Sequence, residues 1–396
     1  MPENHSFFDQ HLAQTTPFPF GLEIERAEGV WLYDPSGKRY MDLISGVGVS
    51  ALGHGHPKVI KAIKDQAEKH LHVMVYGEFM QAPQRELAHK LTSLIPSSLD
   101  TCYFVNSGAE AIEAALKLAK RVTGRSKLVS CRGAYHGSTH GAMSVSGNEV
   151  KKQAFRPLLP DVYFMTFNDF SSLDLIDKNT AGVIIETVQG DAGVRIPSKE
   201  WIQALRKRCT DHGVLLILDE IQAGLGRTGK LFAFEHFDVV PDILVLGKAL
   251  GAGMPIGAIV ASKHHMAQFS TDPMLGHITT FGGHPLICAA AKAGLDVLTE
   301  EVDLNLVSQR GKKLADSLRK HPKVKEVRQI GYYFAIDMET RADVEHVVNY
   351  GMEHGYIGFW FLSCPNSFRI APPLVISDEE LSWAEDQLIN ALNGLR

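Results

Sequence analysis

The segment Val214–Glu220 reads VLLILDE, a run of five apolar residues that ends in two carboxylates. A short apolar run of this kind, preceded by Gly213, is typical of a buried strand. Similar runs recur along the chain and predict further strands at four places: Cys102–Val105, Leu128–Ser130, Val183–Ile185 and Ile243–Leu246. The sequence therefore predicts a central sheet that includes a strand at Val214–Leu218.

Helical patterns separate these strands. Five apolar residues after the first run keep helical spacing, namely Ile112, Ala115, Leu116, Ala119 and Val122. A second helix is predicted by Ile202, Leu205 and Cys209, and Gly213 is placed to end it. Strands that alternate with helices form a mainly parallel sheet covered by those helices, so the predicted fold class is α/β.

The domain organisation follows from where this alternation begins and ends. A chain of 396 residues is long enough for two or three domains. We expect a large domain over about residues 51–294 and a smaller, discontinuous α+β domain made of residues 1–50 and 295–396. Ser377 and Glu380 hold capping-box positions before apolar residues at helical spacing, which predicts a helix that closes the smaller domain.

Composition excludes several classes of protein. Hydrophobic residues make up 45% and charged residues 21% of the chain, as in ordinary folded proteins. The net charge is −5, and no block of like charge interrupts the mixture. This pattern argues against a nucleic-acid or membrane-surface binder and favours a small-molecule partner.

The cysteines and the N-terminus indicate a reducing compartment, and we expect the protein in the cytoplasm. The two closest of the five cysteines, Cys102 and Cys131, are 29 positions apart, so the chain has no CxxC pair. The first residues, MPENHSFFDQ, contain acidic side chains and no apolar stretch, unlike a secretory signal. Residues 243–261 match a membrane span in length, but Lys248 and several glycines interrupt them, so we expect a buried strand and a glycine-rich turn.

Polar or glycine-rich residues follow several of the predicted strands. They are Asn106-Ser107-Gly108, Glu186, Asp219-Glu220 and Gly247-Lys248. In open α/β sheets, ligands bind outside the carboxyl ends of the strands. We therefore expect these residues to converge on one site.

Two interpretations fit the segment Asn106–Glu110, which leads from a strand into a helix. Backbone N–H groups at the start of the helix attract an anion, so a phosphate fits there. Ser107 and Glu110 also match a capping box, which needs no ligand. The segment by itself does not decide between them.

Asp219 and Lys248 each end a buried apolar run. A carboxylate there needs a partner or a cationic ligand, although an N-cap or a salt bridge would satisfy it. A lysine in a low-dielectric pocket has a lowered pKa and becomes a nucleophile towards carbonyls, although an isolated lysine more often lies at the surface.

Other motifs argue against rival chemistries. Residues 224–229 read GLGRTG and match GxGxxG, but the following LFAFEHFDVVPD lacks the amphipathic helix of a dinucleotide site. Paired histidines occur without HExxH or a cysteine cluster, so no metal site is expected; the pairs are His54/His56, His70/His72 and His136/His140. No GxSxG elbow of a hydrolase is present.

Taken together, these residues resemble the class III (ω-amino acid) aminotransferases, a fold-type I pyridoxal-phosphate family. The resemblance covers almost the whole chain, and Asp219 and Lys248 have the family spacing of 29 residues. The matching segments are GHGHP (53–57), NSGAEAIEAALKLAK (106–120), AYHG (134–137), ETVQGDAGV (186–194), DEIQAGLGRTG (219–229), LGKALGAGMPIGA (246–258), TTFGGHP (279–285) and FRIAPPL (368–374).

The resemblance implies that the cofactor is pyridoxal 5′-phosphate. Lys248 would hold it covalently and then move the proton between substrate and cofactor. Asp219 would pair with the pyridine nitrogen and keep it protonated. Gln222, one helical turn later, would bond the phenolic oxygen, and Glu186 would lie beside the cofactor.

The remaining family positions complete the expected site. Tyr135 would stack on the cofactor ring, and the phosphate would be bound by Ser107, Gly108 and Ala109. Thr280 would reach the phosphate in the neighbouring subunit, which implies a homodimer with shared active sites. Arg369 would receive the substrate carboxylate through a bidentate fork.

Two departures from the family pattern concern the substrate. Many members that use glutamate have an arginine directly after the YHG segment, where this chain has Ser138. Those members also have glutamate in place of Asp191, a residue that can cover the carboxylate-binding arginine. Specificity for ornithine or 4-aminobutyrate is therefore not implied.

The predicted function is a PLP-dependent aminotransferase that moves an amino group from an amino acid or ω-amine to a 2-oxo acid. Neither a nucleic acid nor a membrane is an expected partner. A decarboxylase or aminomutase on the same scaffold is an alternative, because the cofactor chemistry is shared. A relative without catalytic activity is a second alternative, against which Lys248, Asp219 and Gln222 together argue. The donor and the acceptor are left open.

Overall fold

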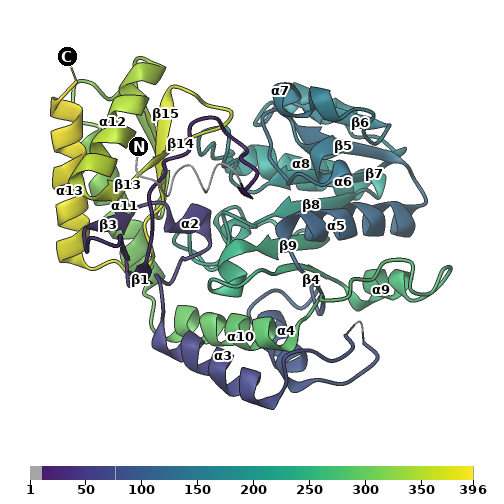
Figure 1. The fold of residues 1–396 in the computed structure, drawn as a ribbon. Helices are drawn as coiled ribbons and strands as arrows, with labels where there is room; N and C mark the ends of the chain where they lie inside the picture. The colour runs from purple at the N-terminus through teal and green to yellow at the C-terminus, as the bar shows by residue number, and fades with distance from the viewer. Residues whose placement is uncertain (1–10, 76, 396) are drawn as a thin grey trace.

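The computed structural model describes residues 11–75 and 77–395, so the N-terminal MPENHSFFDQ lies outside the described residues. A seven-stranded sheet with the order β4-β10-β9-β8-β7-β5-β6 forms the centre (Figure 1). Its strands are β4 (Thr101–Val105), β5 (Lys127–Cys131), β6 (Val162–Met165), β7 (Thr180–Glu186), β8 (Leu215–Asp219), β9 (Ile243–Gly247) and β10 (Gly257–Ala261). All pairings are parallel except those of β10 with β4 and β9. The α/β fold with a mainly parallel sheet is confirmed.

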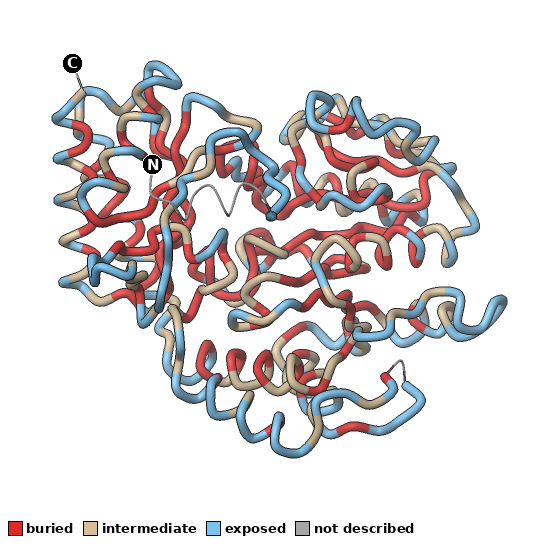
Figure 2. Tube along the Cα trace, in the orientation of Figure 1, coloured by how far each residue is buried: buried red, intermediate tan, exposed pale blue. Residues whose placement is uncertain are grey.

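Helices α5 (Gly108–Thr123) and α8 (Lys199–His212) pack against opposite faces of this sheet. Leu215 and Ile217 of β8 share a core cluster with α5, whereas Leu216 and Leu218 belong to the cluster that contains α8. Strand β8 is therefore buried on both faces, which explains why VLLIL has no polar alternation. Buried residues run through the strands of the central sheet in Figure 2.

Five strands of the central sheet were expected, and two more are present. Strand β6 is a half-exposed edge strand, and its short apolar run gives a weak signal. Strand β10 follows directly after the glycine-rich turn and returns antiparallel to β9. The strand and turn expected at residues 243–261 are confirmed, and a return strand completes them.

Two smaller sheets lie beside the large one. The first has β1 (Arg26–Glu28), β2 (Trp31–Tyr33), β3 (Arg39–Asp42) and β13 (Tyr356–Ile357). The second has β11 (Glu326–Ile330), β12 (Tyr333–Asp337), β15 (Ser367–Ile370) and β14 (Phe359–Trp360). Because β3 from the start of the chain pairs with β13 from its end, the first sheet supports a discontinuous second domain.

The other helices surround these sheets. Helices α11 (Leu304–Leu318), α12 (Arg341–His354) and α13 (Asp378–Asn393) lie beside the small sheets, and α3 (Pro57–Lys69), α4 (Ala82–Ser93) and α10 (Pro285–Glu300) pack together elsewhere (Figure 1). Four short helices are α2 (Ser45–Gly48), α6 (His140–Val145), α7 (Glu149–Lys152) and α9 (Lys263–Met266). Residue 294 lies within α10, so we propose that the division between the domains falls at the end of this helix.

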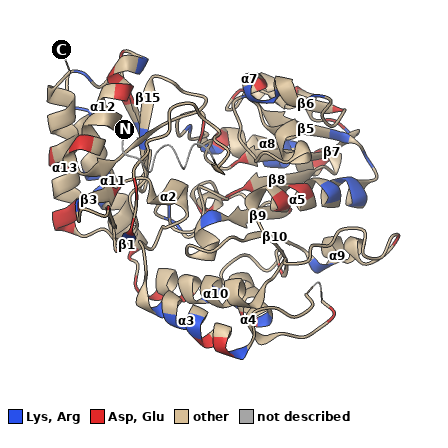
Figure 3. Cartoon of the chain, viewed as in Figure 1, with Lys and Arg blue, Asp and Glu red and all other residues tan. Residues whose placement is uncertain are grey.

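The expected helix ends are confirmed. Gly213 closes α8 with a left-handed φ of 60°, a conformation that glycine adopts without strain. Ser377 and Glu380 form a reciprocal capping box at the start of α13. None of the described helices has the length and apolar character needed to cross a bilayer. Charges of both signs are interspersed over the helices in the view of Figure 3.

Candidate active site

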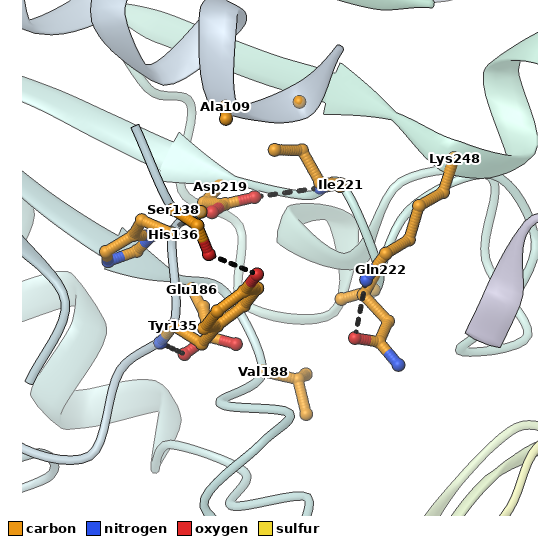
Figure 4. Close-up of a pocket in the computed structure, with 13 residues that line it drawn as sticks. Ala109, Tyr135, His136, Ser138, Glu186, Val188, Asp219, Ile221, Gln222 and Lys248 are labelled. Atoms are coloured by element: carbon orange, nitrogen blue, oxygen red, sulfur yellow. Dashed lines mark hydrogen bonds and ion pairs between the residues drawn. The ribbon is translucent and has the colours of Figure 1, made fainter. Parts of the chain in front are cut away.

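The loops that follow β4, β5, β7, β8 and β9 line a cavity of ≈ 330 Å³. The lining residues that the structure describes are Gly108, Ala109, Tyr135, His136, Gly137, Ser138, Glu186, Val188, Asp219, Ile221, Gln222, Ala223 and Lys248 (Figure 4). The expected convergence at the carboxyl ends of the strands is thus present for Gly108, Glu186, Asp219 and Lys248. Asn106, Ser107 and Glu220 are not part of the lining.

Asp219 ends β8 with its carboxylate buried, at 5% exposure. Its Oδ2 lies 2.7 Å from Nδ1 of His136, and its Oδ1 accepts a hydrogen bond from the Ile221 amide at 2.9 Å. A carboxylate accepts only, so Nδ1 carries the proton of this hydrogen bond. Nε2 of His136 has no partner in the described part of the chain. His136 therefore holds the carboxylate that the sequence predicts to face a pyridine nitrogen.

Lys248 begins the 3-10 helix Lys248–Gly251 directly after β9, with a φ of 42°. This left-handed backbone is rarely adopted by residues other than glycine and is typical of functional sites. Nζ donates a hydrogen bond to Oε1 of Gln222 at 2.8 Å. Burial, assisted by the nearby cation Arg369, lowers the pKa of Lys248 to about 8. The amine is therefore far more often neutral than that of an exposed lysine.

Gln222 lies in a turn, so the expectation that it follows Asp219 by one helical turn is wrong. Residues 221–228 form consecutive turns rather than a helix. Gly226 and Gly229 have φ values of 87° and 82°, which a continuing α-helix does not allow. The side chain of Gln222 nevertheless lines the cavity beside Lys248, as Figure 4 shows.

Glu186 ends β7 and connects two loops of the site. Its Oε2 accepts a hydrogen bond from the Tyr135 amide at 3.2 Å, and its Oε1 accepts one from the Gly190 amide at 3.0 Å. Burial raises the pKa of Glu186 to about 7. The carboxyl group therefore fixes the loop that carries Tyr135, whose ring lies in the cavity (Figure 4).

The start of α5 bears on both interpretations of residues 106–110. Oγ of Ser107 accepts a hydrogen bond from the Glu110 amide at 3.2 Å, as in a cap. The Glu110 carboxylate binds Asn106 rather than Ser107, so the capping box is incomplete. Gly108 and Ala109 line the cavity, and the first N–H groups of a helix have no acceptor within it. These amides are suited to an anion.

Arg369 lies on β15, outside the cavity lining and only 8% exposed. Its guanidinium lies 5.2 Å from the ring centre of Phe359 and 5.6 Å from that of Phe361. Its Nε has no hydrogen-bond partner among the described residues. A buried arginine without an acceptor is suited to bind an anion from solution.

Asp191 does not cover Arg369. Its Oδ1 accepts a hydrogen bond from the Leu362 amide at 3.0 Å, and its Oδ2 accepts one from the Ser363 hydroxyl at 2.8 Å. No ion pair joins Asp191 to Arg369 in the described chain. Ser138, the other departure from the family pattern, lines the cavity with its hydroxyl 3.3 Å from that of Tyr135.

Thr280 is exposed and does not line the cavity of its own chain. It lies in a segment with several exposed apolar side chains, namely Met274, Leu275, Ile278 and Phe281. The ring of Phe281 packs 5.1 Å from that of His72, which brings this segment beside residues 71–75 and 77–80. That second segment also exposes Leu71, Met74, Phe79 and Met80.

Sequence reasoning missed His136 as the partner of Asp219, because it considered this residue only as one of a histidine pair. Its place directly after Tyr135 in the YHG segment was the available signal. Glu220 was expected in the site but accepts hydrogen bonds from the Ala233 and Phe234 amides, both at 2.7 Å, and is structural. Arg227 of GLGRTG donates to the backbone carbonyls of Tyr332 and Pro372. Among the residues described, no His, Cys, Asp and Glu cluster is suited to a metal ion.

Comparisons with known proteins agree with this geometry. The family model described as "Aminotransferase class-III" matches residues 13–392. The acetylornithine aminotransferase of Methanopyrus kandleri is 38% identical over 389 residues, with 97% of each chain covered. The ornithine aminotransferase of Bacillus cereus is 38% identical over 92% of this chain and 93% of its own.

Solved structures show the same fold. A crystal structure of the ornithine aminotransferase from Toxoplasma gondii has a TM-score of 0.91 and 32% identity, and covers 98% of this chain and 94% of that one. A further structure of that protein has partial occupancy of PLP at its active site. The sheet order and the helices around it are therefore those of a known group of enzymes.

Proposed function

Because this chain belongs to the class III aminotransferases, we propose that its substrates are amino acids and 2-oxo acids whose carboxylate is bound by Arg369. The chain is a PLP-dependent aminotransferase that moves an amino group to a 2-oxo acid. The comparisons give no support to the decarboxylase or aminomutase alternatives. The proposal adds the chemical class of the substrate to this activity.

The cavity has the groups that pyridoxal phosphate requires. Asp219 offers a carboxylate to a pyridine nitrogen, and Tyr135 offers an aromatic ring to its face. The amides of Gly108 and Ala109 offer donors to a phosphate, and Lys248 offers an amine with a lowered pKa. The bound cofactor supplies an electron sink for the bond that is broken at the substrate carbon.

The side chains that line the cavity have separate roles in the reaction. Lys248 Nζ, held by Gln222 at 2.8 Å, is the group that moves a proton at the reacting carbon. His136 donates to Asp219 and so keeps the carboxylate in place. Glu186 fixes the Tyr135 loop through its amide. Val188 gives one side of the cavity an apolar lining.

Arg369 is the observation that carries the substrate proposal. Its guanidinium is buried, Nε lacks an acceptor, and its charge lowers the pKa of Lys248. A carboxylate bound there would stand beside the reacting amine. Ser138 lines the cavity at the position where many family members that use glutamate have an arginine. These features favour monocarboxylic over dicarboxylic substrates.

The test compares Arg369→Ala with the wild type on an amino acid and on a primary amine that has no carboxylate. Losing a bidentate contact to a carboxylate weakens binding about tenfold to a hundredfold or more. We expect this rise in the half-saturating concentration for the amino acid only. Equal losses on both substrates, or none, would refute the carboxylate role of Arg369.

A homodimer with shared active sites is also part of the proposal. The exposed apolar side chains around Thr280 and at Leu71, Met74, Phe79 and Met80 form a patch of the kind that a second copy covers. Thr280 would reach the phosphate of the partner's cofactor from there. A location in the cytoplasm stays a prediction.

Mixing two inactive variants tests the shared site. A hybrid of Lys248→Ala and Thr280→Ala subunits has one site with both residues intact, so activity should return on mixing. A mixture that stays inactive, or a Thr280→Ala protein that binds PLP as tightly as the wild type, would rule out the role across the interface.

A further inference from the structure

Tyr333 has a buried hydroxyl for which the described part of the chain provides no partner. The residue begins β12, and none of its surface is exposed. Its Oη makes no hydrogen bond. An unpaired hydroxyl in a protein interior is unfavourable. We therefore expect another state of the protein in which this hydroxyl has a hydrogen-bond partner.

The strand register brings Tyr333 towards Arg369. Ala335 of β12 lies directly opposite Arg369 of β15, and Phe359 of β14 lies opposite Arg369 on the other side. Side chains two residues apart in a strand point to the same face, so Tyr333 shares the face of Ala335 and Arg369. Tyr333 and Arg369 are thus diagonal neighbours, and such long side chains can reach one another. Ala335 and Ala371, which pack in the cluster of Tyr333, are small and leave them room.

The charged groups that act on the Tyr333 hydroxyl include residues in or next to the active site. Burial raises the pKa of Tyr333, and the carboxylates of Glu186 and Asp191 raise it further. The guanidinium groups of Arg369 and Arg227 act in the opposite direction. The hydroxyl therefore lies within electrostatic range of Arg369, whose own buried Nε–H lacks an acceptor.

Gly190 holds the tyrosine in this position. A Cβ on Gly190 would lie 2.0 Å from Tyr333 Oη, so the hydroxyl rests directly on the glycine backbone. The Gly190 amide in turn donates to Glu186, which lines the cavity. The end of the tyrosine ring is thus fixed by the loop that carries Glu186.

We propose that Tyr333 is a positioning residue for Arg369, whose Nε–H donates a hydrogen bond to the Tyr333 hydroxyl when a carboxylate is bound. A bidentate carboxylate uses two of the five N–H groups of a guanidinium, and a bond at Nε fixes the direction of the fork. This inference rests on the proposed role of Arg369. The hydroxyl of Tyr333 thereby helps the enzyme to select substrates that carry a carboxylate.

The experiment uses the PLP-loaded enzyme and pentanoate, a monocarboxylate that has no amino group and is not turned over. Calorimetry gives the dissociation constant for the wild type, Tyr333→Phe, Arg369→Ala and the double variant. Tyr332→Phe is the matched control, because Tyr332 is equally buried but packs in the other core cluster. Thermal unfolding of each protein is measured alongside.

We expect Tyr333→Phe to weaken pentanoate binding about tenfold and Tyr332→Phe to leave it unchanged. The Tyr333 effect should disappear in the Arg369→Ala background, because the tyrosine acts through the arginine. The melting temperature of Tyr333→Phe should be equal to or above that of the wild type, since a partnerless hydroxyl is removed. For a carboxylate substrate, KM should rise more than kcat falls.

Two results would overturn the inference alone, and a third would overturn the proposed function together with it. Unchanged pentanoate binding in Tyr333→Phe, with binding lost in Arg369→Ala, would refute only the role of Tyr333. An equal loss from Tyr333→Phe with and without Arg369 would do the same. Unchanged binding in Arg369→Ala would refute the carboxylate subsite itself, and the inference with it.

Discussion

The imidazole of His136 lies 2.7 Å from the carboxylate of Asp219, and both side chains are buried. The hydrogen bond joins the loop after β5 to the end of β8. The carboxylate is therefore fixed from two sides, by His136 at Oδ2 and by the Ile221 amide at Oδ1.

Replacing His136 by phenylalanine keeps an aromatic ring but removes the donor to Asp219. PLP should still bind, whereas turnover should fall about tenfold to a hundredfold, as expected for the loss of a hydrogen bond to a charged group. Steady-state rates at saturating PLP measure this. Asp219→Asn is the reference and should lose more activity. A His136→Phe rate within twofold of the wild type would show that the imidazole is dispensable.

Lys248→Ala should fold normally and lose transamination, because no other amine lines the cavity that the structure describes. Lys248→Gly should also be inactive but at least as stable as the alanine variant, since glycine adopts the φ of 42° without strain. Product formation and thermal unfolding are the measurements. Appreciable turnover by either purified variant would contradict the assignment of Lys248.

The pKa of Lys248 predicts how the apoenzyme recombines with PLP. The reactive amine is the neutral form, so a pKa lowered to about 8 means that the recombination rate rises with pH through that value and then levels off. Because the Arg369 charge contributes to this lowering, Arg369→Ala should move the midpoint to higher pH. A midpoint near that of a free lysine, or one unchanged in the variant, would be inconsistent with the electrostatics described.

Ser138→Arg should add a cation where a second carboxylate would lie. The catalytic efficiency should then improve more for glutamate and 2-oxoglutarate than for alanine and pyruvate, and Ser138→Ala should show no such preference. The comparison of kcat/KM values for the four substrates checks this. Efficient use of glutamate by the wild type, unaltered in Ser138→Arg, would mean that another residue binds its second carboxylate.

Gly190→Ala should destabilise the protein, because the new methyl group would lie 2.0 Å from Tyr333 Oη. Overpacking of this kind is worth about 1–3 kcal/mol. Adding Tyr333→Phe should recover much of the loss, since the nearest ring carbon is then 3.3 Å away. Thermal unfolding of the two single variants and the double variant tests the contact. Additive effects would exclude it.

The sequence by itself determined five of the seven strands of the central sheet and the edge of the sheet at which the site lies. Apolar runs such as Val214–Leu218 are encoded locally, because a strand buried on both faces must be apolar throughout. Polar residues that end such runs, such as Asp219 and Lys248, fall at the carboxyl edge of the sheet by topology alone. The segments that match the family predicted the family and the cofactor, both of which were confirmed, whereas the residues assigned to the cofactor stay a prediction.

The tertiary structure decided which side chains are partners. His136 and Asp219 are 83 positions apart, and no local pattern shows that they meet. The sequence left open whether Asp191 covers Arg369. In the structure, both carboxylate oxygens of Asp191 accept hydrogen bonds from residues 362 and 363 instead. Gln222 lies in a series of turns, and the positive φ values of Gly226 and Gly229 after it are incompatible with a continuing α-helix. Hydrogen-bond partners depend on which long-range segments the fold brings together, whereas burial of a strand depends mainly on its own residues.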